Sequence, residues 1–220
     1  CSSDLITIDN QLLLTEAKHD PISKNLKTSA FFGKLVVNMF IIKKTKSFIL
    51  SILDAKSSDK DFHLVPPILR EKILNLKPKK EKHFLVYQTS TSNKELEPTL
   101  LNFPDEKFIV YGFHKNKKVK NLNYKKNNEK EFLEDLRTAK AVITNGGHTL
   151  ISEAINLKKP ILSIPVQNHF EQQLNGIHAH MSGFGMMEKE ISEYALDQFL
   201  RNLPEYEFYL RKHKKDRKST

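Results

Sequence analysis

From residue 83 onward, short apolar runs alternate with longer segments whose apolar residues recur at helical spacing. The runs have the length of buried strands, and Phe132, Leu133, Leu136 and Ala139 show the helical pattern within Glu129–Lys140. The expected strands are Phe84–Tyr87, Phe108–Tyr111, the weaker Val119–Tyr124, Ala141–Thr144 and Ile161–Pro165. The expected helices are Asn93–Leu101, Glu129–Lys140, Thr149–Leu157, Phe170–Met181 and a long terminal helix from Ser192. This alternation predicts an α/β fold with a Rossmann-like open parallel sheet over residues 83–220.

The first 82 residues show a different pattern, with fewer elements and two proline-containing breaks. The expected features are a strand at Asp4–Ile8, a mostly helical Pro21–Ile42, a strand at Phe48–Leu53, and linker signals at Pro66-Pro67 and Lys77–Lys80. These elements are too few for a complete Rossmann-like layer. We interpret residues 1–65 as the trailing part of a second, incomplete Rossmann-like domain and residues 66–82 as an interdomain linker. The chain opens at Cys1 rather than Met, so we expect an upstream portion.

Candidate chemistry is concentrated where the strand Ala141–Thr144 turns into the next helix, at Asn145-Gly146-Gly147. Adjacent glycines let the backbone adopt positive φ and approach a ligand closely. The N-terminus of the following helix presents unpaired N–H groups and a partial positive charge, which suit a diphosphate. Within that helix, the carboxylate of Glu153 can accept hydrogen bonds from two vicinal hydroxyls. The alternative is a plain turn in which the glycines serve only the bend.

Two further polar turns follow neighbouring expected strands, at Gln88–Asn93 and Gln167–Asn175. In open α/β sheets, ligands bind at the carboxyl ends of the strands, where these turns would converge. A sugar needs paired donors and acceptors, and Glu171 with Gln172 supplies a carboxylate beside an amide. Hydroxyl and N–H groups of the first turn can hold phosphate oxygens. The convergence favours a ligand site over three unrelated solvent loops.

The segment Asn145–Ala154, together with Lys159-Pro160, Pro165 and Glu171–Asn175, resembles the donor-binding signature of GT-B glycosyltransferases. It is most similar to the family-28-like bacterial transferases that add N-acetylglucosamine to the peptidoglycan lipid intermediate. UDP-glucuronosyl and macrolide glycosyltransferases share the pattern more loosely. The resemblance covers most of residues 83–190. It extends weakly to Ile6–Gln11, in the family's N-terminal domain, and to Pro66–Arg70, in its interdomain segment.

The resemblance implies a metal-independent transferase whose donor, a UDP-sugar, is a substrate, so that no cofactor is needed. The implied donor-binding residues are Thr89, Ser90, Phe113, Asn145, Gly146, Gly147, His148, Thr149, Glu153, Phe170, Glu171, Gln172, Gln173 and Asn175. The diphosphate would lie on the glycine turn with help from Thr89 and Ser90, and Glu153 would hold the ribose. Glu171, Gln172 and Gln173 would hold the sugar. The nucleobase of the donor would lie near Phe113 and Tyr124–Phe132.

The catalytic base is less well specified, since in this family it lies in the N-terminal domain. Asp9, at an expected strand end, is the candidate, and a capping or turn aspartate is the competing interpretation.

Two departures from the family pattern concern the phosphate contacts. Several relatives carry His or Arg where this chain has Asn145, so a cationic contact is missing unless His148 replaces it. The turn after Tyr87 also lacks glycine, whereas close relatives are glycine-rich there.

The net charge of +10 comes from basic segments spread along the chain, including Arg211–Lys218 at the C-terminus. Solvated lysine-rich loops, an anionic membrane surface and nucleic acid are all compatible with this charge. No aromatic residues are interleaved with the basic ones as in base-stacking surfaces, so we expect no nucleic-acid partner. A single cysteine rules out an internal disulfide and fits the cytoplasm. The basic tail would hold the protein at the inner face of the plasma membrane, beside a lipid-linked or glycan acceptor.

Three alternatives to a transferase remain at this point. A non-catalytic nucleotide-sugar-binding module would keep the donor site alone. A UDP-sugar epimerase would require several acidic and histidine residues around the glycines, where this segment shows mainly Glu153. A basic nucleic-acid-binding protein would show strongly salt-dependent binding to DNA or RNA.

Overall fold

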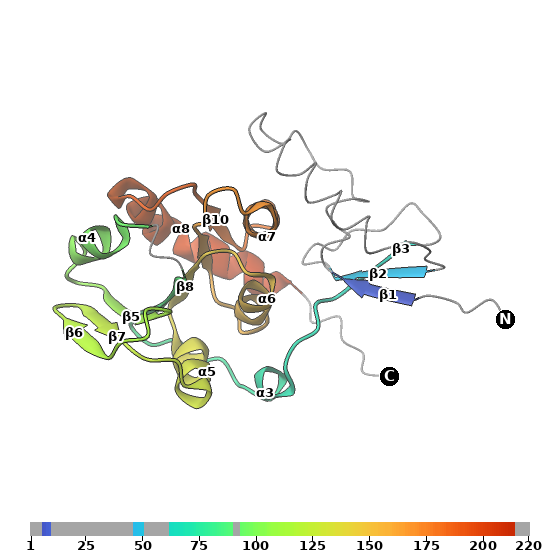
Figure 1. The fold of residues 1–220 in the computed structure, drawn as a ribbon, viewed down its shortest axis with the longest axis horizontal. Coiled ribbons are helices and arrows are strands. Elements are labelled where there is room, and N and C mark those ends of the chain that lie inside the picture. The colour runs from blue at the N-terminus through green and yellow to red at the C-terminus, as the bar shows by residue number, and fades with distance from the viewer. Residues whose placement is uncertain (1–5, 10–45, 51–61, 90–92, 214–220) are drawn as a thin grey trace.

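The computed structural model describes residues 6–9, 46–50, 62–89 and 93–213, and these form two β-sheets (Figure 1). The smaller sheet contains β1 (Ile6–Asp9), β2 (Lys46–Leu50) and β3 (Phe62–Val65), all parallel and in that order. The strands expected at Asp4–Ile8 and Phe48–Leu53 overlap β1 and β2, whereas no strand was expected at the position of β3. The expected helix Pro21–Ile42 lies outside the described residues.

The larger sheet has seven strands in the order β10-β9-β8-β4-β5-β7-β6. They are β4 (His83–Tyr87), β5 (Lys107–Tyr111), β6 (Lys117–Val119), β7 (Leu122–Tyr124), β8 (Ala141–Thr144), β9 (Ile161–Ser163) and β10 (Gly185–Met187). Only the pairing of β6 with β7 is antiparallel, so the predicted, mostly parallel α/β sheet is confirmed. The expected single strand Val119–Tyr124 is instead a hairpin of two short strands.

The described helices are α3 (Glu71–Leu74), α4 (Leu96–Leu101), α5 (Glu129–Thr138), α6 (His148–Asn156), α7 (Phe170–Met181) and α8 (Glu193–Lys212). Two of them begin with side-chain caps that the sequence supplies. Asn128 Oδ1 accepts from the N–H of Glu131, and Ser192 Oγ accepts from the N–H of Ala195, each at 3.1 Å. Such caps satisfy N–H groups that have no partner within the helix. Among the described helices, none is long and apolar enough to cross a membrane.

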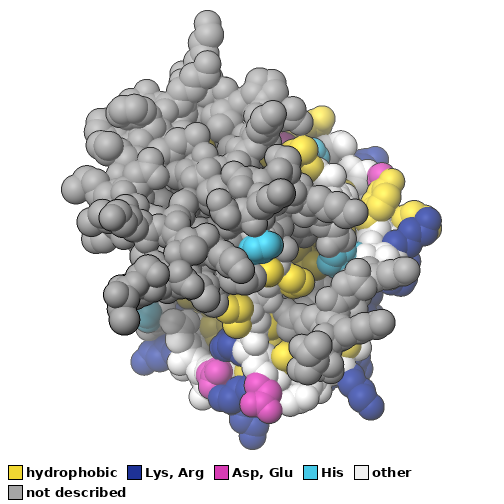
Figure 2. Space-filling view, turned by 90° about the vertical axis from the view of Figure 1, so that its right-hand side faces the viewer, with side chains coloured by type: hydrophobic (Ala, Val, Ile, Leu, Met, Phe, Trp, Pro, Cys, Tyr) yellow, Lys and Arg dark blue, Asp and Glu magenta, His cyan; other side chains and the backbone are white. Residues whose placement is uncertain are grey.

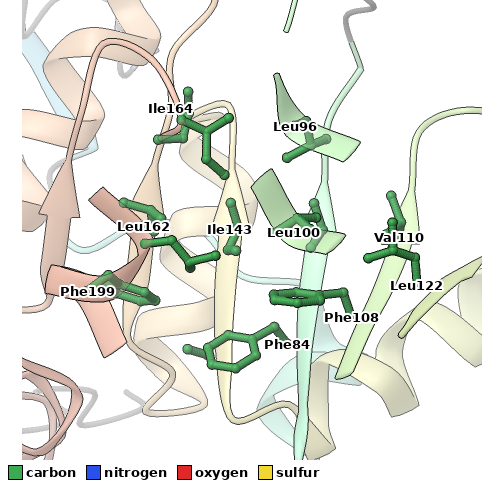
Figure 3. Packing of buried hydrophobic residues seen from close by; sticks show 14 of the residues in the cluster. Phe84, Leu96, Leu100, Phe108, Val110, Leu122, Ile143, Leu162, Ile164 and Phe199 are labelled. Atoms are coloured by element: carbon green, nitrogen blue, oxygen red, sulfur yellow. The ribbon is translucent and has the colours of Figure 1, made fainter. Parts of the chain in front are cut away.

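The core lies on both faces of the larger sheet because successive strand residues point to opposite sides. On β4, Phe84 and Val86 pack in one hydrophobic cluster and Leu85 in the other. The first cluster includes residues of α4 and α8, and the second includes residues of α3, α5 and α6. Figure 3 shows the first face, where Leu96 and Leu100 of α4 and Phe199 of α8 lie over the strand side chains.

Three neighbouring strands of this sheet end level with one another. Tyr87 of β4 is aligned with Thr144 of β8, and Thr144 is in turn aligned with Ser163 of β9. Because the strands are parallel, the chain segments that leave their carboxyl ends start side by side. These segments are the three polar turns that the sequence singled out.

Candidate functional site

Asn145 joins the three polar turns from the inside. Its Nδ2 donates to Gln88 Oε1 at 2.5 Å and to the carbonyl oxygen of Ile164 at 3.2 Å. Its Oδ1 accepts from the N–H of Thr89 at 2.9 Å. Only 6% of Asn145 is exposed. An amide supplies both donors and acceptor here, which an arginine cannot do. Asn145 therefore fixes the three turns to one another, and this role explains why an amide occupies the position.

Gly146 is required by the backbone and by its neighbours. Its φ is +93°, and a Cβ at this position would lie 2.5 Å from the carbonyl oxygen of Gln172 and 2.9 Å from Ser163 Oγ. Asn175 Nδ2 donates to the carbonyl oxygen of Gly146 at 3.0 Å. Gln172 Oε1 accepts from the N–H of Val166 at 3.0 Å, within the turn after β9. These predicted site residues thus hold the turn against α7.

Gly147 has a different environment, although it is adjacent in sequence. It is the N-cap of α6 with φ −63° and ψ 132°, and no described atom beyond its two chain neighbours lies within 4 Å of where its Cβ would be. The first backbone bond of α6 runs from the N–H of Ile151 to the carbonyl of Gly147, so the N–H groups of residues 148–150 precede it. The fold does not require a glycine here, and the open space suits the close approach of a ligand.

This helix end opens onto a cavity of about 970 Å³. Five predicted donor-site residues line it, namely Gly147, His148, Thr149, Glu153 and Glu171. Other lining residues come from the segment before α3, from β4 and from the start of α5, and include Ile68, Arg70, Tyr87, Asn127, Asn128, Glu129 and Phe132. The cavity thus has an aromatic wall, an open helix N-terminus and carboxylates.

Two aromatic rings form part of that wall. Tyr87 and Phe132 meet edge-to-face with their centroids 5.6 Å apart. Phe132 belongs to the range in which the sequence placed the base pocket, whereas Tyr87 was not anticipated. Its signal was present in the sequence, because it is the last residue of a strand that runs into a polar turn. An apolar, aromatic surface of this kind can accommodate a nucleobase.

His148, the first residue of α6, is a titratable group in the cavity wall. Burial lowers the pKa of its imidazole, while a hydrogen bond with the Asn175 side chain and the charge of Glu171 act in the opposite direction. Its Nε2 is buried and has no hydrogen-bond partner among the described residues. A buried polar atom without a partner is costly, so this nitrogen is a weak point of the local packing beside the cavity. Burial therefore favours the neutral imidazole over the cation at this position.

Glu153 is 1% exposed and forms a bidentate ion pair that the sequence did not reveal. Arg70 Nε donates to Glu153 Oε1 at 2.6 Å, and Arg70 Nη2 donates to Oε2 at 2.8 Å. Arg70 Nη1 also reaches Glu129 Oε1 at 3.2 Å. The only sequence signal for Arg70 was its position in the segment that resembles the family's interdomain connection.

Other predicted residues lie away from the cavity lining. Phe113 is not among the residues that line the cavity, and its ring packs edge-to-face against Tyr124 with centroids 5.8 Å apart. Phe170 is 8% exposed in the core, and the N–H of Gln173 donates to the carbonyl of His169 in the first turn of α7. Asp9 ends β1, and its side chain, like the whole of Ser90, is outside the described parts of the chain. No group of three or more His, Cys, Asp or Glu positioned for a metal occurs among the described residues.

Comparison with known proteins places this site in a family context. Residues of this chain are 41% identical over 54 positions to an uncharacterized glycosyltransferase of Methanopyrus kandleri, covering 24% of this chain and 16% of the relative. An uncharacterized glycosyltransferase of Methanosarcina acetivorans is 40% identical over 60 positions, covering 26% and 16%. The alignments thus span about a sixth of each curated relative.

Solved glycosyltransferase structures share the fold at low sequence identity. The glycotransferase of kitacinnamycin superposes with a TM-score of 0.58 at 15% identity, covering 77% of this chain and 50% of that one. Phytolacca americana UGT2, solved with UDP-2-fluoro-glucose and pterostilbene, gives a TM-score of 0.59 at 13% identity, covering 84% and 51%. This chain thus spans about half the length of these two proteins, and its fold is that of GT-B glycosyltransferases. Residues 2–204 match glycosyl transferase family 1, and the chain therefore belongs to that family.

Proposed function

We propose that this chain binds a UDP-sugar in the 970 Å³ cavity and forms the donor-binding part of a hexosyltransferase. The observation that carries the proposal is the open N-terminus of α6. Gly147 faces free space there, and Gly147, His148 and Thr149 at this helix end all line the cavity. Family membership and the UDP-2-fluoro-glucose in the Phytolacca americana structure support a UDP-sugar as the ligand.

In the proposed complex, the nucleobase lies against Tyr87 and Phe132. The diphosphate accepts hydrogen bonds from the N–H groups at the start of α6, where the helix dipole favours negative charge. The ribose hydroxyls donate to Glu153. Glu171, which lines the cavity, holds the transferred sugar, and Gln172 and Gln173 follow it in the first turn of α7. N-acetylglucosamine or another hexose fits the family resemblance.

The reaction transfers the sugar to a hydroxyl of a lipid-linked or glycan acceptor. A base removes the hydroxyl proton, and the oxygen attacks the anomeric carbon while the bond from that carbon to the diphosphate oxygen breaks. The bonding electrons leave with UDP, whose additional charge the α6 N–H groups stabilise without a bound metal. Asp9, at the carboxyl end of β1, is our proposed base. The basic segment Arg211–Lys218 would keep the protein at an anionic membrane with its acceptor, on the cytoplasmic side.

Calorimetric titration of the full chain with UDP, UDP-glucose and UDP-N-acetylglucosamine tests the donor site. We expect saturable binding that Glu153→Ala weakens by about 1–3 kcal/mol, the usual cost of losing a buried hydrogen-bond partner. Gln172→Ala should lower the stability, because Gln172 Oε1 accepts from the N–H of Val166, and should weaken binding less than Glu153→Ala does. Absence of binding to the wild-type chain would contradict the proposal.

Transfer requires a separate assay with radiolabelled UDP-sugars and lipid-linked or glycan acceptors. Labelled product, lost in Asp9→Asn with donor affinity unchanged, supports the transferase. Donor binding without any product would instead support the non-catalytic module, since the chain spans only about half of the enzymes it superposes on. Sedimentation with anionic liposomes, with and without residues 211–218, tests the membrane contact, and equal sedimentation would exclude a role for the tail.

A further inference from the structure

Arg70 connects the segment between the two sheets to two helices of the larger domain. It is the N-cap residue of α3, and its guanidinium contacts carboxylates from both α6 and α5. Toward Glu153 the contact is bidentate, at 2.6 and 2.8 Å, whereas Glu129 receives a single bond at 3.2 Å. One side chain therefore joins a buried carboxylate in the cavity wall to an exposed one at its rim.

The two oxygens of Glu153 already accept one N–H each from Arg70. At 1% exposure the carboxylate needs such donors, because a buried charge without a partner is strongly unfavourable. A vicinal diol also offers two donors, one to each carboxylate oxygen. Either the Arg70 guanidinium or the ribose diol can therefore supply the hydrogen-bond donors that Glu153 needs. In this structure the guanidinium bonds both oxygens of the carboxylate that the ribose must reach.

A second position for the guanidinium already exists. Glu129 is 49% exposed on its side chain, and the Arg70 side chain is 40% exposed, so the pair can move at the surface. Lys72 Nζ also bonds Glu129, at 2.5 Å from Oε2. Figure 2 shows acidic and basic side chains side by side along the lower edge of the molecule, the level of α3 and α5 in Figure 1. Arg70 can therefore leave Glu153 and keep an anionic partner.

We propose that Arg70 and the ribose diol of the donor are alternative partners of Glu153. Donor binding moves the guanidinium fully to Glu129, and residues 66–70 then lose their ion pair with α6. Arg70 is thus a positioning residue that opposes ribose binding and couples the donor site to the segment between the sheets. This inference rests on the proposed function of the cavity.

The test compares the affinities of UDP and 2′,3′-dideoxy-UDP for the full chain. The dissociation constant of 2′,3′-dideoxy-UDP divided by that of UDP measures how much the diol contributes to binding. We expect Arg70→Ala to raise this ratio about tenfold, because the diol no longer displaces a charged hydrogen-bond donor. Arg70→Lys, a point charge that cannot bond both oxygens in the same way, should raise it less. Glu129→Gln, which removes the second position, should lower it.

Arg201→Ala is the matched control, because Arg201 pairs with Asp197 on the exposed surface of α8. Its ratio should equal that of the wild type. An unchanged or lower ratio in Arg70→Ala, with UDP still bound, would overturn the inference and leave the donor site intact. If that variant does not fold, the other two variants test the inference, because the ratio should rise in Arg70→Lys and fall in Glu129→Gln. Failure of the wild-type chain to bind UDP would instead overturn the proposed function and the inference with it.

Discussion

The two sides of the Gly146-Gly147 turn differ in what their polar groups contact. On the inner side, Asn145 bonds to the neighbouring turns and Gly146 to Asn175 of α7, and both are enclosed by protein. On the outer side, Gly147 and His148 face the cavity, with free space at one and a buried nitrogen lacking a described partner at the other. One continuous motif therefore contains both a framework and a surface for a ligand.

This difference changes how the family signature is interpreted. The inner residues of the signature are needed for the fold itself, because the hydrogen bonds that they make hold the three turns together. Residues on the outer side have no such explanation in the described structure. Substitutions on the inner side should therefore lower stability, and those on the outer side should lower ligand affinity.

The largest expected effect is on the inner side, from Gly146→Ala. A Cβ in the left-handed region and 2.5 Å from the carbonyl oxygen of Gln172 combines backbone strain with a clash. We expect a loss of about 3 kcal/mol or more in the free energy of unfolding, measured by urea denaturation. Wild-type stability would show that the turn adapts easily and would remove the distinction between the two glycines.

Asn145→Ala should cost about 2 kcal/mol, since buried partners lose their hydrogen bonds. Gln88 is fully buried and its Nε2 has no partner among the described residues, so the loss of Asn145 leaves its Oε1 unsatisfied as well. Urea denaturation again measures the loss in the free energy of unfolding. Unchanged stability combined with weaker UDP binding would place Asn145 on the ligand side instead.

The smallest expected effect concerns the pH dependence of stability through His148. Burial lowers the pKa of this imidazole in the folded protein, so the unfolded chain takes up the proton first as the pH falls. Stability should therefore decrease as the pH falls through the unfolded-state value of about 6.5. We expect His148→Gln to reduce that decrease between pH 7.5 and about 5, measured by thermal unfolding. An identical pH profile would show that burial does not hold the imidazole neutral.

The sequence predicted the parallel sheet because its central strands are continuous apolar runs buried on both faces, such as Phe84–Tyr87. It did not reveal β10, whose three residues Gly185–Met187 show no alternation, or the separate edge strand Lys117–Val119, which is mostly lysine. The glycine turn was recognisable from its position between a strand and a helix. The pairing of Arg70 with Glu153 was not, since the two residues are 83 positions apart and meet only through tertiary packing.

The central claim, that a nucleotide diphosphate lies against the start of α6, is tested most directly by Gly147→Ala. Its φ of −63° and the empty space at its Cβ position mean that alanine fits the described fold. We predict a change in unfolding free energy below about 0.5 kcal/mol, with UDP binding weakened at least tenfold, or about 1.4 kcal/mol, in calorimetric titration. Unchanged stability together with unchanged UDP affinity would contradict the account.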